Sequence, residues 1–170
     1  TNEPGAHAGW SAIVLKKGKE HSDFVTNVRH LAEDTTSDQQ VRTVVDGEAT
    51  AVFQGGIKVA KDSQRIEGDQ LSRALMLSDR AQAFTKPELE IYADDVKCSH
   101  GATVGDLDAE ALFYMRARGI DDAAARALLI LAFAREPFEA LDLPEQVQTM
   151  LDGKIQEWLG VSGRFEELEL

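Results

Sequence analysis

The chain of 170 residues has the length of one domain, or of one domain with an appendage, and its 43% hydrophobic and 28% charged residues are typical of a globular protein. Its 18 Lys and Arg residues against 30 Asp and Glu residues give a formal net charge of −12. Such a surface repels phosphate backbones and anionic lipid, which argues against nucleic-acid and membrane-surface binding.

Several features indicate a cytoplasmic protein. The longest apolar stretch, Ala127 to Ala134, is far shorter than the ~20 residues that span a bilayer. The N-terminal residues have neither the basic start nor the apolar core of a signal peptide, and they lack an initiator Met, so we expect a processed chain or a part of a longer one. The single cysteine, Cys98, excludes an internal disulfide and fits a reducing compartment.

Between Val25 and Cys98 the apolar residues tend to alternate with other residues, which is typical of short strands. The alternating pairs are Val41/Thr43/Val45, Ala51/Phe53, Ile57/Val59, Leu75/Leu77, Ala81/Ala83, Leu89/Ile91 and Val96/Cys98. Turn-forming residues separate these runs at 33–38, 46–47, 55–56, 61–63, 67–69, 78–79 and 85–87. No intervening stretch could form a crossover helix, so the candidates are a sandwich, a barrel or a β-solenoid. We favour the solenoid because the strands run on without a clear start at the N-terminus.

After Gly105 the period becomes helical. Asp106 or Asp108 can cap a first helix through about Arg118, with Gly119 in the left-handed position that follows it. Asp121 can cap a second helix, which Pro137 should end or kink near Glu136.

A third helix is predicted to have Pro144 in its first turn and to stop at Gly160, with a loose acidic tail after it. Its apolar stripe consists of Val147, Met150, Leu151, Ile155, Trp158 and Leu159. The change of period therefore predicts two domains, residues 1–105 and 106–170. The second has 14 acidic and 6 basic residues and carries most of the net charge.

The motif "KCSHG" places Cys98 two residues before His100. On a strand the two side chains would project from the same face. Three interpretations remain open from the spacing alone: a buried thiol beside an ordinary histidine, a Cys–His nucleophile pair, or an incomplete metal site that a partner chain completes. The other histidines, His7, His21 and His30, have no ligand spacing and are interpreted as structural.

Three further observations bear on function. The adjacent Asp94 and Asp95 could serve as glycosidase or lyase carboxylates, but neighbouring strand residues face opposite sides, so a solvated turn is the simpler interpretation. No phosphate-binding glycine loop of the Walker type is present, so the sequence predicts no ATP site. The segment "ALFYM", at 111–115, is apolar almost all round, and we expect that helix to be covered on most sides, which points to a docking partner.

Four stretches carry a resemblance to a known family. Residues 85–120, with the string "YADDVKCSHGATVG", resemble the C-terminal segment of SufD, a scaffold subunit of the Suf iron–sulfur cluster assembly system in the SufB/SufD family. Residues 30–59, 70–79 and 125–141 resemble flanking parts of the same family. Since members of this family are longer, we expect the chain to be a C-terminal portion.

The resemblance implies a mainly β fold with α: the end of a right-handed parallel β-helix (a β-solenoid, 1–105) followed by a C-terminal helical domain (106–170). It implies a non-enzymatic, cytoplasmic scaffold for iron–sulfur cluster assembly. The β-helix would pair with a SufB-type subunit, and the helices would dock a SufC-type ABC ATPase within a SufBCD complex.

The resemblance also places a site on the motif residues. It implies that His100, with Cys98 as a companion, contacts iron or a transient iron–sulfur cluster at an interface shared with the SufB-type chain, and that the isolated chain binds neither tightly. The exposed solenoid end could pair with a second copy, giving a homodimer. The alternative from another class is a β-helix hydrolase or lyase acting on polysaccharide or ester substrates.

Overall fold

The chain divides into two compact units, Thr1–Gly105 and Asp106–Leu170. The structure is a computed structural model and describes residues 1–139 and 141–161. Within these residues the first unit contains seven strands and the second three helices. No helix within the described ranges is long and apolar enough to cross a membrane.

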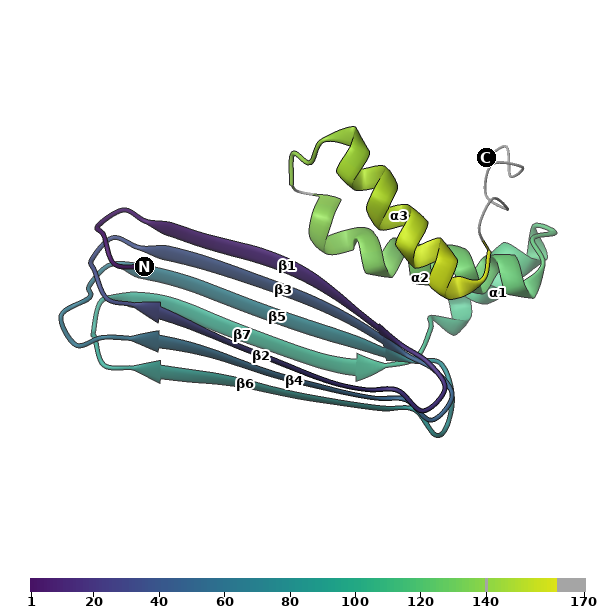
Figure 1. Ribbon diagram of the computed structural model, residues 1–170, viewed down its shortest axis with the longest axis horizontal. Coiled ribbons are helices and arrows are strands. Elements are labelled where there is room, and N and C mark those ends of the chain that lie inside the picture. Colours follow the sequence, from purple (N-terminus) through teal and green to yellow (C-terminus); the bar gives the residue numbers. More distant parts are fainter. Residues whose placement is uncertain (140, 162–170) are drawn as a thin grey trace. The chain divides into compact units, whose positions relative to one another are not determined.

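The first unit is a parallel β-solenoid, as predicted. The strands are β1 His7–Lys16, β2 His21–His30, β3 Thr36–Val45, β4 Thr50–Val59, β5 Ile66–Met76, β6 Gln82–Ile91 and β7 Val96–Gly105. They form two parallel sheets, β1-β3-β5-β7 and β2-β4-β6, which lie as two layers (Figure 1). The chain passes from one sheet to the other with each successive strand, so each of the first three coils contributes one strand to each layer and β7 begins a fourth.

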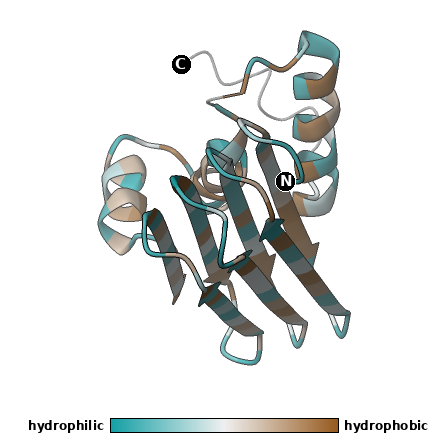
Figure 2. Ribbon diagram, turned by 90° about the vertical axis from the view of Figure 1, so that its left-hand side faces the viewer, coloured by the Kyte–Doolittle hydropathy of each residue, from teal (hydrophilic) through white to brown (hydrophobic). Residues whose placement is uncertain are grey.

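Alternate residues of each strand face the space between the layers. In β4 these are Ala51, Phe53, Gly55, Ile57 and Val59, all of them buried. Figure 2 shows the matching hydrophilic and hydrophobic bands along the strands. Burial of one such valine or isoleucine stabilises the fold by about 1.5–3 kcal/mol, and the parallel register stacks these side chains in continuous rows from coil to coil.

Three segments predicted as turns lie inside strands instead. Residues 55–56 are in β4, 67–69 in β5 and 85–87 in β6. The two segments that contain Gly55 and Gly68 stay extended because these glycines face the interior of the solenoid. Neighbouring side chains lie at or close to the position that a Cβ atom would take there. Pro87 is tolerated because β6 is the last strand of its sheet, so its nitrogen can face an open edge.

The prediction of the first strands was incomplete, and the phase of one strand was wrong. β1, and β2 before Val25, were not predicted, because most residues of β1 are half-buried on both faces and give no alternation. In β5 the interior residues include Gln70, Ser72 and Ala74. Leu75 is therefore out of phase with them, and Leu77 follows the end of the strand.

The second unit contains α1 Ala109–Ala117, α2 Asp122–Glu139 and α3 Glu145–Leu159. Asp108 caps α1 by accepting from the backbone N–H groups of Glu110 and Ala111. Asp121 accepts from Ala123 and Ala124 at the start of α2. Gly119 and Gly160 have the left-handed φ values of 91° and 70° expected of residues that follow a helix. These caps and stops agree with the sequence prediction.

Two proline predictions need correction. α2 does not end at Glu136: Pro137 lies within the helix, which continues to Glu139. Proline removes one intrahelical hydrogen bond, and the removal costs less in the last turn than in the middle of a helix. Pro144 occupies the N-cap position of α3 and so precedes its first turn.

The apolar stripe predicted on α3 is only partly buried. Ile155 is fully buried and Leu151 half-buried, whereas Met150 is 58% exposed. The predicted acidic tail, from Gly163 onward, lies outside the described residues.

Candidate functional site

Cys98 and His100 lie on the same face of β7, as the spacing predicted. Their register partners in β5, Gly68 and Gln70, are both buried residues of the solenoid interior. Cys98 is half-buried and His100 is exposed. The difference arises at the end of the coil stack: β7 is the last strand of its sheet, so no further coil of the described residues covers its inner face.

The thiol of Cys98 borders Gly68, in the interior row formed by Ser37, Gly68 and Cys98. A Cβ atom at Gly68 would be 3.3 Å from Ser37 Oγ and 3.4 Å from Cys98 Sγ. Burial raises the pKa of the Cys98 thiol, as does the nearby Asp69 carboxylate, while a hydrogen bond with the Gly68 backbone lowers it. The net direction is upward, so Cys98 is a protonated thiol at neutral pH and must lose its proton to bind a metal.

The next interior row leads to His100 and is unexpectedly polar. It runs from Trp10 through Gln39 and Gln70 to His100, with one residue from each strand of the sheet. Gln39 and Gln70 are 0% and 2% exposed. Gln39 Oε1 accepts from Thr26 Oγ1 at 3.0 Å and from Gln70 Nε2 at 3.4 Å. Among the described residues, Gln39 Nε2 and Gln70 Oε1 have no hydrogen-bond partner.

The glutamine row was missed in the sequence, although a signal for it exists. Both glutamines occupy interior positions where the alternation calls for apolar residues, and they stand in register one coil apart. Gly55 of the facing sheet accommodates the second of them, because a Cβ there would lie 1.8 Å from Gln70 Nε2. The glycine in β4 and the glutamine in β5 are thus complementary.

The other three histidines lie on strands and contact hydroxyl or carboxylate groups. His30 is fully buried, with Nδ1 2.7 Å from Thr35 Oγ1 and Nε2 3.0 Å from Ser37 Oγ. Burial, with a smaller effect of the N-terminal ammonium, lowers the pKa of His30 and keeps its ring neutral. His7 and His21 are exposed and contact Thr36 and Asp23.

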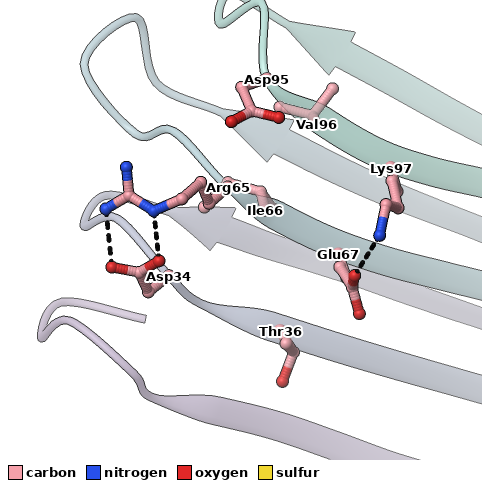
Figure 3. Close-up of a pocket in the computed structure, with 8 residues that line it drawn as sticks. All are labelled: Asp34, Thr36, Arg65, Ile66, Glu67, Asp95, Val96 and Lys97. Carbon is pink, nitrogen blue, oxygen red and sulfur yellow. Dashed lines mark hydrogen bonds and ion pairs between the residues drawn. The ribbon is translucent and has the colours of Figure 1, made fainter.

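A surface pocket of about 310 Å³ lies where β3, β5 and β7 begin (Figure 3). Its charged residues are Asp34, Arg65, Glu67, Asp95 and Lys97. Arg65 Nη2 donates to Asp34 at 2.8 Å and to Glu33 at 2.7 Å, and Lys97 pairs with Glu67 at 2.9 Å. The Arg65 guanidinium lowers the pKa of the Asp34 carboxyl, which therefore stays ionised.

The acidic pair considered as catalytic, Asp94 and Asp95, precedes β7 and is exposed. The Asp95 backbone N–H donates to Gln64 Oε1 at 2.9 Å, and its carbonyl oxygen accepts from the Arg65 backbone N–H at 2.7 Å. These contacts are those of a turn between coils. Within residues 1–139 and 141–161, no three or more His, Cys, Asp or Glu side chains are grouped so that they could hold a metal ion.

The helix that was expected to be covered on most sides has two exposed aromatic residues. Phe113 and Tyr114 of α1 are 75% and 56% exposed, and no residue of α1 is buried. The guanidinium of Arg118 lies over the Tyr114 ring, 4.4 Å from its centroid. The described part of the chain leaves both aromatic side chains exposed, so coverage of α1 by a docking partner stays a prediction.

Comparison with known proteins supports the resemblance found in the sequence. The chain is 42% identical to the iron–sulfur cluster assembly protein SufD of Escherichia coli over 131 residues, which are 77% of this chain and 31% of that protein. It is 42% identical to an iron–sulfur cluster assembly SufBD family protein of Synechocystis over 132 residues, 78% of this chain and 29% of that protein. SufD of Bacillus subtilis is 27% identical over 155 residues, 89% of this chain and 36% of that protein.

The chain thus spans about a third of the length of these relatives. Residues 1–133 match the family model described as the SufBD core domain of SUF-system FeS cluster assembly proteins. The match covers the whole solenoid and continues into α2. The chain belongs to the SufBD core family.

Proposed function

We propose that this chain acts in iron–sulfur cluster assembly as a non-catalytic scaffold, in which His100 and Cys98 contribute to a site that a second chain completes. The observation that carries the proposal is the position of His100. It lies in an interior row of the solenoid, yet it is exposed because the coil stack ends at β7. The names of the SufD relatives in Escherichia coli and Bacillus subtilis support the assembly role.

The chemistry of the two side chains suits iron as cargo. A neutral imidazole binds iron, and a thiolate is the soft ligand of iron–sulfur clusters. Two ligands are too few for a cluster, which usually takes four, so a SufB-type subunit would supply the others. The exposure of His100 makes it the first ligand, with the half-buried Cys98 as its companion.

The helical unit would dock a SufC-type ABC ATPase. The support is the exposed pair Phe113 and Tyr114 on α1, since solvent-exposed aromatic side chains are frequent at protein interfaces. The SufB-type subunit would pair with the solenoid through the open edges of β6 and β7.

The proposal is tested with His100→Ala in cells or in a reconstituted system with the partner subunits. His21→Ala is a matched control, because His21 is also an exposed histidine on a strand. We expect His100→Ala to abolish the visible absorption of the assembled cluster and His21→Ala to leave it intact. Normal cluster absorption in the His100→Ala protein would overturn the role proposed for this residue.

ATPase docking is tested by capture of the ATPase on the immobilised protein. Glu110→Lys and the pair Phe113→Ser, Tyr114→Ser change the exposed surface of α1 and should reduce capture at least about tenfold, as hot-spot losses do. Asp62→Lys reverses an exposed charge in the solenoid and is the control. Capture that survives all the α1 changes would exclude this surface.

A β-helix hydrolase or lyase is the other candidate class. The pocket in Figure 3 gives this enzyme class little support. Arg65 holds Asp34 in its ionised form, so Asp34 is a poor proton donor. Turnover of polysaccharide or ester substrates by the purified protein, lost in an Asp95→Asn variant, would favour the enzyme over the scaffold.

A further inference from the structure

The row that ends at His100 contains a buried acceptor without a donor. Gln70 is 2% exposed, and its Oε1 has no hydrogen-bond partner among the described residues. A buried carbonyl oxygen left unpaired costs about 1–3 kcal/mol, so such atoms usually have an occupant or a role.

The direction of the glutamine row indicates where the missing donor should come from. Gln70 uses its amide nitrogen toward the preceding coil, where Gln39 Oε1 accepts it at 3.4 Å. In a stack of in-register amides each group donates to one neighbour and accepts from the other. The neighbour on the other side of Gln70 is His100, in register on β7 and on the same face.

The lengths of the two side chains select one imidazole nitrogen. Gln Oε1 and His Nε2 are separated from their Cα atoms by the same number of bonds, whereas His Nδ1 is one bond closer. Side chains of register partners on one face stand side by side, so atoms at equal reach meet. The donor that matches Gln70 Oε1 is therefore Nε2–H of His100.

We propose that Gln70 is a positioning residue for His100: its Oε1 accepts a hydrogen bond from Nε2–H and leaves the Nδ1 lone pair for iron. Ligating histidines commonly give their second N–H to such an acceptor, which fixes the tautomer and the ring orientation. No hydrogen bond joins the two side chains in the structure. The proposed bond requires a rotation of the exposed His100 ring, and rotamer changes of exposed side chains are fast.

The proposed hydrogen bond between Gln70 and His100 does not require iron. Its role in presenting His100 to iron rests on the function proposed above. Nitrogen-15 NMR of the imidazole rings measures it in the metal-free protein at alkaline pH, where free imidazole is neutral. We expect His100 to show one dominant tautomer, with the proton on Nε2 and a ring N–H signal protected from exchange. In Gln70→Met the N–H signal should exchange at least about tenfold faster, because its acceptor is gone.

One variant controls for general effects on the interior. Thr85→Val removes the hydroxyl of Thr85, another buried polar atom with no hydrogen-bond partner among the described residues. It should leave the His100 ring signals unchanged. Identical His100 signals in the wild-type and Gln70→Met proteins would overturn the inference, as would a change produced by Thr85→Val and not by Gln70→Met.

A second readout separates the two proposals. In cluster assembly with the partner subunits, Gln70→Met should lower the yield or rate about 10–100-fold, the usual loss for a residue that supports a ligand. If His100→Ala has no effect while the NMR contact is present, the proposed function fails and the contact stands. If His100→Ala abolishes assembly but Gln70→Met changes neither NMR nor assembly, only the role of Gln70 fails.

Discussion

At the scale of single residues, Gly55 allows the amide of Gln70 to lie against the backbone of β4. A Cβ on Gly55 would be 1.8 Å from Gln70 Nε2 and 2.6 Å from the Cζ atom of Phe53. Both neighbours are buried, so neither can move into solvent. The glycine is therefore required by a side chain of the other sheet and not by a turn.

We expect Gly55→Ala to lower the free energy of unfolding by about 1–3 kcal/mol, the usual cost of forcing atoms into a packed interior. Urea unfolding measures it. In a Gln70→Ala background the same change should cost clearly less, because the clashing amide is absent. Gly56→Ala is the control: its nearest side-chain atom is 3.6 Å away, and stability should hardly change. Equal costs of Gly55→Ala in both backgrounds would show that Gln70 is not the obstacle.

The second residue-scale prediction concerns Cys98. Since burial raises its thiol pKa, the thiolate fraction at a given pH is smaller in the folded protein than in the unfolded chain. The pH at which alkylation by iodoacetamide reaches half its maximal rate should therefore be higher in buffer than in denaturing urea. A folded-state midpoint at or below the urea value would mean that the thiol is activated.

At the scale of elements, α1 and α2 begin at aspartates that were identified from the sequence. Capping is a local interaction between one side chain and the backbone two or three residues later, so short patterns suffice to predict it. The end of α2 was predicted less well, because Pro137 can be tolerated in a last turn that packing stabilises, and Pro137 is buried.

Asp108→Ala and Asp121→Ala should each lower the unfolding free energy by about 0.5–2 kcal/mol, because each removes an acceptor for two backbone N–H groups. Thermal unfolding followed by helical circular dichroism measures the effect. The Asn variants keep the acceptor oxygen and should lose much less. If Asn and Ala are equally destabilising, charge and not capping is responsible.

At the scale of the whole solenoid, β6 and β7 are the last strands of their sheets, so one edge of each has no strand partner among the described residues. Unpaired parallel edges can pair with another chain. The same open end gives His100 its exposure, so the edge and the candidate site belong to one surface of this unit.

We expect the isolated chain to self-associate through this end, which sedimentation at micromolar concentrations would detect as a concentration-dependent dimer. Val104→Lys should shift it to monomer, because it places a charge on the inner face of β7 at a position that is already 41% exposed. Val25→Lys, at a 67% exposed position of β2, is the control. If only Val25→Lys abolished the dimer, the dimer interface would lie at the other end of the coil stack, where β2 is.

The sequence by itself determined the solenoid, the change to helices after Gly105, the caps of α1 and α2, and the shared face of Cys98 and His100. These depend on local period, on single capping residues and, for the solenoid, on family resemblance. Only the tertiary structure decided the register that aligns Gln39, Gln70 and His100, the place of Gly55 opposite Gln70, and the Asp34–Arg65 pair. Such contacts join residues about 30 positions apart in coils of unequal length, and no local pattern specifies which residues will meet.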